Sequence, residues 1–262
     1  MTDHPARITN RMHLEIACAA APVGRVLDHL YCWQGTGFLI SNRLFITNNH
    51  VILESQTAKN FLVEFNYELN AKGTPKPVSR FALSPNDFFM SSPEEDLDFT
   101  IVAVGKRVLG KARLSDFGFC PLKSTSDEHA IDTLASIIGH PMGQFKQVSF
   151  RRNRIVAQNE KVLQYYTDTD VGSSGSPVFN DNWEAIALHH WGAPIKITYD
   201  SMGNQGKKGT KEGIRISAIV EKINSEKGTL NMKQLQLIEN ALNCDLPSPV
   251  SRAKKATLRG CL

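Results

Sequence analysis

The stretch "VGSSGSPVF" (residues 171–179) places Ser174 between small residues, just before an apolar and β-prone run. Gly and Ser are common in ordinary turns, so this pattern alone is weak evidence for a nucleophile. A serine hydroxyl becomes a good nucleophile only when a neighbouring base accepts its proton. The meaning of Ser174 therefore depends on whether the chain also supplies a base, an acid that orients the base, and an oxyanion site.

A histidine and an aspartate in the first half of the chain are candidates for these roles. His50 ends "LFITNNH" (44–50), where an apolar strand runs into a small polar turn, and Asp98 opens the apolar run "DFTIVAV" (98–104). A buried carboxylate is costly without a partner, and a catalytic histidine would be such a partner. Taken singly, each has an ordinary explanation, a structural or surface histidine and a turn-capping aspartate.

The chain order of the three residues separates two catalytic plans. The order here is His50, Asp98, Ser174. The α/β-hydrolase plan uses a Gly-x-Ser-x-Gly turn between a strand and a helix, in the order serine, acid, histidine. Ser176 stands where that plan requires its second glycine, and a strand follows. That plan is therefore disfavoured.

The hydrophobic pattern predicts an all-β protein. Two successive series of short aromatic and β-branched segments, about six in each, span residues 31–105 and 133–220 and are separated by turn residues. Such series favour paired antiparallel barrels or sandwiches over an alternating βα fold. We also expect a helix followed by a turn over 8–30, and helices at 217–225 and 231–243. The corresponding organisation is an N-terminal helical extension (1–30), a first β-barrel (31–115), a second β-barrel (116–225) and a C-terminal helix with a basic tail (226–262).

Composition narrows the function classes. The formal net charge of +4 over 262 residues is mild, so binding to nucleic acid is not favoured. The five cysteines are scattered, without a Cys-x-x-Cys pair, which predicts free thiols in a reducing compartment. The N-terminal segment lacks the pattern of a signal peptide and no run is long enough to span a membrane, so we expect a cytoplasmic protein without a membrane partner. No metal or cofactor is expected, because His-Glu-x-x-His and phosphate-binding glycine motifs are missing from the sequence.

Four motifs in order carry a resemblance to a known family. They are "GTGFLI" followed by "LFITNNHVI", "DFTIVAV", "YTDTDVGSSGSPVFND" and "AIALHHWG". Together they resemble the chymotrypsin-fold (trypsin-like) serine proteases, in particular the bacterial trypsin-like peptidases related to glutamyl endopeptidases and high-temperature-requirement proteases. The resemblance covers about residues 23–225. It implies two packed antiparallel six-stranded β-barrels and a serine endopeptidase that cleaves protein or peptide substrates through an acyl-enzyme.

The resemblance also implies a role for each matching residue. Ser174 would attack the carbonyl carbon, His50 would take and return the proton, and Asp98 would hold the imidazole in the useful tautomer. The backbone N–H groups of Gly172 and Ser174 would form the oxyanion hole. Thr100 departs from the family pattern, which usually has Ala at this place.

Two further departures concern activation. Ser173 stands where zymogen-activated members have an aspartate, and no "IVGG"-like segment is present in the sequence. Maturation through the usual salt bridge to a new N-terminus is therefore excluded. Regulation would fall to loops, to the N-terminal helix or to a regulatory protein partner, and relatives of this bacterial type often belong to stress or defence systems. The competing hypothesis is a catalytically silent, protease-like binding module. The retained His50, Asp98 and Ser174 favour the enzyme.

The sequence gives conflicting signals on the residue accepted before the cut bond. Asp168 lies at the spacing where trypsin itself carries the acid that binds Arg or Lys. Thr169 and His189 match the Thr and His that bind Glu or Gln in glutamyl endopeptidases and several viral proteases, and Trp191 and Gly192 continue the strand that lines the pocket. Two matched donors outweigh one ambiguous acid, which favours Glu or Gln, with Arg or Lys as the alternative.

Overall fold

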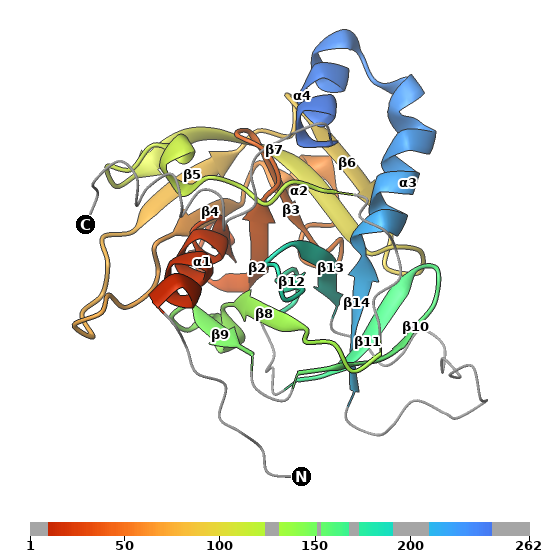
Figure 1. Ribbon diagram of the computed structural model, residues 1–262. Coiled ribbons are helices and arrows are strands. Elements are labelled where there is room, and N and C mark those ends of the chain that lie inside the picture. Colours follow the sequence, from red (N-terminus) through yellow and green to blue (C-terminus); the bar gives the residue numbers. More distant parts are fainter. Residues whose placement is uncertain (1–9, 124–130, 151–152, 168–172, 191–209, 243–262) are drawn as a thin grey trace.

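The computed structural model describes residues 10–123, 131–150, 153–167, 173–190 and 210–242 (Figure 1). Antiparallel sheets dominate this part of the chain, and helices lie mainly before the first sheet and after the second. The expected all-β, chymotrypsin-like arrangement is confirmed. The organisation differs from expectation in the number of strands and at the N-terminal boundary.

The first sheet closes into a barrel. Its strands are β1 (Val23–Leu27), β2 (Trp33–Leu39), β3 (Leu44–Thr47), β4 (Leu62–Phe65), β5 (Ser79–Leu83), β6 (Phe89–Ser92) and β7 (Phe99–Leu109), with the short helix α2 (Ser55–Ala58) between β3 and β4. The order is β3-β2-β1-β4-β5-β7-β6, and an additional β3–β7 pairing completes the ring. Six strands therefore form the barrel, and β6 lies alongside β7 as a seventh strand.

The second sheet is more open. Its strands are β8 (Ser136–Gly139), β9 (Gln147–Ser149), β10 (Ile155–Gln158), β11 (Val162–Tyr166), β12 (Pro177–Phe179), β13 (Ala185–His190) and β14 (Thr210–Arg215), in the order β10-β11-β14-β13-β12-β8-β9. Among the described residues, no strand ladder closes this ring. Three backbone hydrogen bonds join the chain before β8 to the start of β10: Asp132 N–H to the Ile155 carbonyl at 2.9 Å, and Ala135 N–H to Asn153 and Ile155 N–H to Thr133, each at 3.0 Å.

The N-terminal segment corrects the expected helix and turn over 8–30. The helix α1 (Asn10–Ala20) ends early, and residues 23–27 form strand β1 of the first barrel. Val23, Val26 and Leu27 are fully buried there. β-Branched residues fit such a position, and burial outweighs the local turn signal of Pro22 and Gly24. The first barrel therefore begins at Val23, and the helical extension is shorter than expected.

The helices after the second sheet agree with the sequence. They are α3 (Ile216–Glu226) and α4 (Met232–Leu242), against the expected 217–225 and 231–243. Each has one apolar face, which buries Ile219 and Ile223 of α3 and Ile238 of α4. Their apolar residues at helical spacing gave a clear signal because one face of each helix packs on the core.

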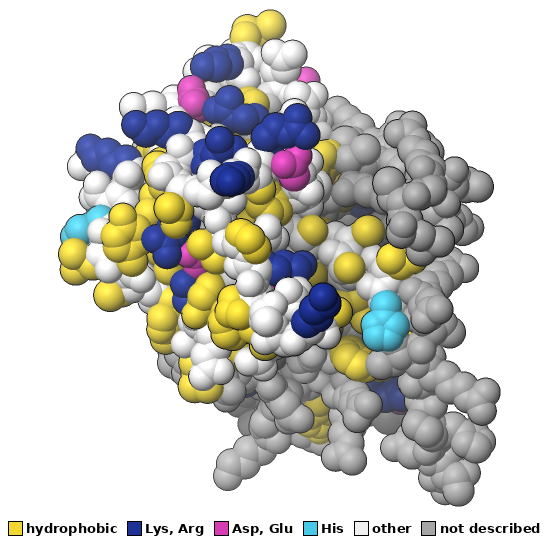
Figure 2. Space-filling model, turned by 90° about the vertical axis from the view of Figure 1, so that its left-hand side faces the viewer, with side chains coloured by type: hydrophobic (Ala, Val, Ile, Leu, Met, Phe, Trp, Pro, Cys, Tyr) yellow, Lys and Arg dark blue, Asp and Glu magenta, His cyan; other side chains and the backbone are white. Residues whose placement is uncertain are grey.

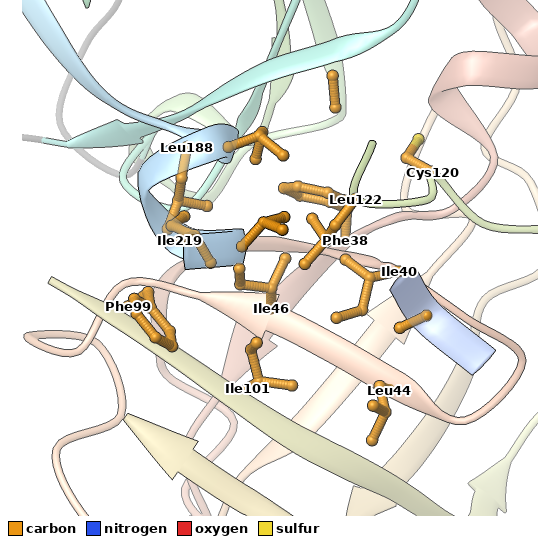
Figure 3. Close-up of a cluster of buried hydrophobic side chains, with 14 of the residues drawn as sticks. Phe38, Ile40, Leu44, Ile46, Phe99, Ile101, Cys120, Leu122, Leu188 and Ile219 are labelled. Carbon is orange, nitrogen blue, oxygen red and sulfur yellow. The ribbon is translucent and has the colours of Figure 1, made fainter. Parts of the chain in front are cut away.

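One hydrophobic cluster joins the two sheets. Figure 3 shows Phe38 and Ile46 of the first barrel close to Leu188 of β13 and Ile219 of α3. All four side chains have no exposed surface. Burial of a large apolar side chain contributes about 1.5–3 kcal/mol, so this cluster fixes β13 firmly against the first barrel. The residues that follow Leu188 on β13 are thereby held at the junction between the sheets.

The surface of the first barrel carries part of the positive charge. Basic side chains gather on the face drawn in Figure 2, with few acidic ones among them. The exposed end of β7 and the segment after it contribute Lys106, Arg107, Lys111 and Arg113, of which Arg113 pairs with Asp116. Within the described part of the chain, no helix is long and apolar enough to cross a membrane. Cys18, Cys32 and Cys120 form no disulfide bond with one another.

Candidate active site

His50 and Asp98 form a hydrogen-bonded pair, although 48 positions separate them in the sequence. The Nδ1 atom of His50 lies 2.8 Å from Oδ2 of Asp98, and the backbone N–H of His50 donates to Oδ1 at 3.0 Å. The Asp98 side chain is fully buried, whereas that of His50 is 24% exposed. A carboxylate only accepts hydrogen bonds, so Nδ1 of His50 carries the proton and Nε2 of the neutral ring is available as a base.

The backbone around this pair is held in an unusual conformation. Asp98 has a φ angle of +38°, in the region that non-glycine residues seldom occupy. Its carbonyl accepts a hydrogen bond from the Asn48 amide at 2.9 Å, and its N–H donates to Pro93 at 2.9 Å. Such strain persists only where surrounding contacts compensate it, and it is typical of functional sites.

Thr100 of β7 forms further hydrogen bonds to the turn after β3, which carries His50. Its hydroxyl donates to the carbonyl of Ile52 at 2.8 Å and accepts from the Asn49 amide at 3.2 Å. An alanine, usual at this place in the family, could form neither bond. The departure noted in the sequence therefore has a structural reason, since Thr100 fastens the turn that carries His50.

Ser174 lies in a tight turn packed against strand β2. The carbonyl of Ser174 accepts the N–H of Thr36 at 2.9 Å. Gly175 follows with a φ angle of +84°, and a Cβ atom there would collide with the carbonyl of Thr36. Only glycine fits this conformation and this close approach. A Cβ atom added at Gly35 would meet both the Val51 side chain and the Ser174 carbonyl, so the serine turn lies beside the segment that follows His50.

His190, for which the sequence motifs predict no role, also contacts Asp98. Nδ1 of His190, at the end of β13, lies 2.5 Å from Oδ2 of Asp98, and its side chain is 1% exposed. Burial tends to lower the pKa of His190, but the hydrogen bond and charge of Asp98, with Glu212 and Glu94, raise it above the ordinary 6.5. The His-His doublet in the strand after Ser174 was the available signal, because adjacent strand residues point to opposite faces.

Asp98 responds to both histidines. Burial tends to raise its pKa, but hydrogen bonds from His190 and His50 outweigh burial and lower it below the ordinary 3.8. The carboxyl group is therefore ionised at neutral pH. A buried ionised carboxylate needs such donors to be tolerated.

His189, the other half of the doublet, faces Tyr165 instead. Its Nδ1 atom lies 2.6 Å from the Tyr165 hydroxyl, and the ring is 1% exposed. Burial, with smaller contributions from Lys211 and His190, lowers the pKa of His189 to about 3. Burial also raises the pKa of Tyr165 well above 10, so both groups are neutral. The remaining expected pocket residues, Asp168, Thr169, Trp191 and Gly192, lie outside the described residues, as does Gly172 of the expected oxyanion hole.

His50, Asp98 and His190 are also residue types that bind metal ions. In the described residues, His50, Asp98 and His190 form one group of possible ligand atoms, all within 4.8 Å of one another. Both Nδ1 atoms lie at hydrogen-bond distance from a single carboxylate oxygen. These contacts match two N–H donors on a shared acceptor, so we interpret the group as a hydrogen-bonded His–Asp–His arrangement.

The barrels, the His50–Asp98 pair and the adjacent serine turn define the architecture of a chymotrypsin-like peptidase. A family model for the trypsin-like peptidase domain matches residues 35–188, which is more than half of the chain. The protein therefore belongs to the trypsin-like peptidase domain family.

Individual relatives give less information about function. The chain is 43% identical over 188 residues to the uncharacterized protein y4fB of Sinorhizobium fredii, covering 69% of this chain and 28% of that protein. It is 26% identical over 203 residues to the secreted RxLR effector protein 73 of Plasmopara viticola, covering 70% and 47%. The chain thus spans less than half the length of either relative. The crystal structure of Rv3671c protease in its inactive form aligns with a TM-score of 0.49 and 17% identity, over 80% of this chain and 91% of that one.

Proposed function

We propose that this protein is a serine endopeptidase in which Ser174 is the nucleophile, His50 the general base and Asp98 the residue that orients His50. The observation that carries the proposal is the double contact between Asp98 and His50, through the ring Nδ1 and the backbone N–H. It fixes the tautomer in which Nε2 can accept a proton. The packing of the Ser174 turn on β2 supports the assignment of the nucleophile.

The proposed reaction proceeds through an ester of Ser174. Oγ of Ser174 attacks the carbonyl carbon of the cut bond while its proton moves to Nε2 of His50. The imidazolium is stabilised by the Asp98 carboxylate and then protonates the leaving amine, which breaks the C–N bond. Water attacks the ester, again with His50 as base, and releases the acid and free Ser174. Backbone N–H groups of Gly172 and Ser174 are proposed to stabilise the oxyanion.

We also propose a preference for Glu or Gln before the cut bond, on the match of Thr169 and His189 to the family pattern. Burial keeps the His189 ring neutral, so that it adds no positive charge of its own. The Tyr165 hydroxyl donates to the Glu212 carbonyl at 3.2 Å and lies 2.6 Å from Nδ1 of His189, which fixes the orientation of the ring. Peptides that differ only in Gln, Glu, Arg or Lys at this position test the preference, and selectivity for Arg or Lys would overturn it.

Labelling with a fluorophosphonate probe tests the nucleophile directly. We expect the folded protein to be labelled once, and both Ser174→Ala and His50→Ala to abolish labelling. Ser173→Ala is the matched control, because Ser173 is the adjacent and equally buried hydroxyl. Loss of either catalytic residue should lower kcat by roughly six orders of magnitude. Labelling that persists in Ser174→Ala would show that Ser174 is not the nucleophile. Folded protein that is never labelled would favour a catalytically silent binding module.

We propose protein or peptide substrates, a cytoplasmic location and a regulatory protein partner in a stress or defence system. The absence of the zymogen aspartate at Ser173 supports regulation by other means. The scattered cysteines of the sequence, without a Cys-x-x-Cys pair, support a reducing compartment. Activity that is lost in dithiothreitol would contradict that location.

A further inference from the structure

Two histidines share one oxygen of the buried aspartate. His50 and His190 approach Oδ2 of Asp98 with their Nδ1 atoms at 2.8 and 2.5 Å. The rings are 6.0 Å apart between centroids and inclined at 76°. They therefore reach the same acceptor from different directions, one from the turn after β3 and the other from the end of β13.

This sharing couples the two rings through the carboxylate. Since the carboxylate accepts and cannot donate, Nδ1 of each ring carries a proton. When His190 is neutral, Asp98 presents its full charge to His50. When His190 is protonated, the buried ion pair cancels much of that charge, and the imidazolium that forms on His50 during catalysis loses stabilisation.

The charges around His190 favour its protonated form. Glu212 lies opposite it in the register of β14, and Glu94 lies in the loop that precedes Asp98. Together with Asp98, they raise the pKa of His190 despite its burial. The neighbouring His189 is neutral, and the remaining partner on Asp98 is His50. The titration of His190 therefore belongs to a coupled group of three residues.

We propose that His190 is a positioning residue that anchors Asp98 through the oxygen used to orient His50, and that protonation of His190 reduces the negative charge that Asp98 presents to His50. This inference rests on the proposed peptidase function. It assigns to the second barrel a direct role in holding the aspartate of the first. The competing explanation is that His190 only fills a buried space at the end of β13.

Proton NMR on the ¹⁵N-labelled full chain tests the contact without requiring activity. The Ser174→Ala protein should show two nitrogen-bound ring protons far downfield that both shift when Asp98→Asn is added. One should disappear in His190→Asn and the other in His50→Ala. Absence of a downfield proton that depends on His190 would overturn the proposal, whether because the ring is rotated or because a metal replaces the proton.

Kinetics separate positioning from space filling. His190→Asn keeps a nitrogen donor the same number of bonds from Cα but cannot ionise, whereas His190→Leu keeps volume and loses the donor. We expect kcat to fall about ten- to a hundredfold in His190→Leu with little change in KM, since a hydrogen bond to a charged group is lost. His190→Asn should retain most of kcat. In both variants the pH profile of kcat/KM should lose one of its two coupled ionisations.

A buried histidine that, among the described residues, forms no hydrogen bond with Asp98 or His50 provides the control. His140 is fully buried, and its pKa is lowered to about 3, chiefly by burial. We expect His140→Asn to change stability without changing the shape of the pH profile. His190→Leu with the profile and kcat of the unmodified protein would show that His190 only fills space. A protein that the fluorophosphonate never labels, yet shows both downfield protons, would contradict the peptidase function and leave the His190–Asp98 contact intact.

Discussion

His189 and His190, adjacent residues at the end of strand β13, lie on opposite faces of the strand and in opposite electrostatic surroundings. His189 and His190 are equally buried. Burial, Lys211 and His190 lower the pKa of His189 to about 3. Burial acts on His190 too, but Asp98, Glu212 and Glu94 outweigh it and raise the pKa. Burial alone therefore does not decide the charge of a histidine, because the groups on the facing elements determine it.

The largest expected effect comes from removing the negative charge of Asp98, which contacts His190. Asp98→Asn should lower kcat by about four orders of magnitude, because the amide stabilises the wrong tautomer of His50. The pKa of His190 should fall below 6.5 at the same time, so that His190 resembles His189. An NMR titration of the ring resonances measures both. A pKa of His190 that stays raised would assign its environment to Glu212 and Glu94.

The dependence of stability on acidic pH tests whether His189 is neutral in the folded protein. His189 stays neutral in the folded protein down to about pH 3, whereas in the unfolded chain it gains a proton below about 6.5. The unfolded state therefore binds more protons in this range, and stability should fall by up to about 1.4 kcal/mol per pH unit on acidification through this residue. His140 contributes in the same direction. Urea unfolding at several pH values between 6.5 and 4.5 gives the unfolding free energy as a function of pH. This free energy should change less with pH in His189→Gln than in the unmodified protein, and an equal change in both would contradict a neutral His189.

The charged side should show the opposite dependence. The pKa of His190 is raised in the folded state, so its ion pair stabilises the protein fully below about pH 6.5 and less as the pH rises through the raised value. The stability difference between the unmodified protein and His190→Asn should therefore shrink as the pH increases. Guanidinium unfolding at pH 6 and pH 9 measures this difference. A difference that grows with pH would mean that His190 is buried neutral like its neighbour.

The smallest effect concerns a group that touches neither histidine of β13. Thr100→Val keeps the shape of the side chain but loses the hydroxyl that bonds Ile52 and Asn49. We expect a loss of about 1 kcal/mol in unfolding free energy. The pKa values of His189 and His190 should not change, which makes Thr100→Val a control for the variants above. A shift in the pKa of either histidine would show that a change in the turn after β3 alters the surroundings of β13.

The sequence predicted the fold class because turn residues separate clear apolar strands, and it predicted α3 and α4 from their apolar faces. It missed strand β1, since Pro22 and Gly24 resemble a turn and only pairing with β2 and β4 reveals a strand. The contact between His50 and Asp98 followed from motif order. The role of His190 did not, because it depends on how β13 docks against the first barrel, which no local pattern encodes.

The shared carboxylate also bears on the order of folding. Asp98 and His190 are 92 positions apart, and the turn of Ser174 is hydrogen-bonded to Thr36 of β2. Contacts between such distant segments form only after the entropy of closing long loops has been offset. A chain in which only the first barrel has folded holds His50 and Asp98 but lacks Ser174 and His190 in place. If the proposed catalytic roles are right, such a chain should have no peptidase activity.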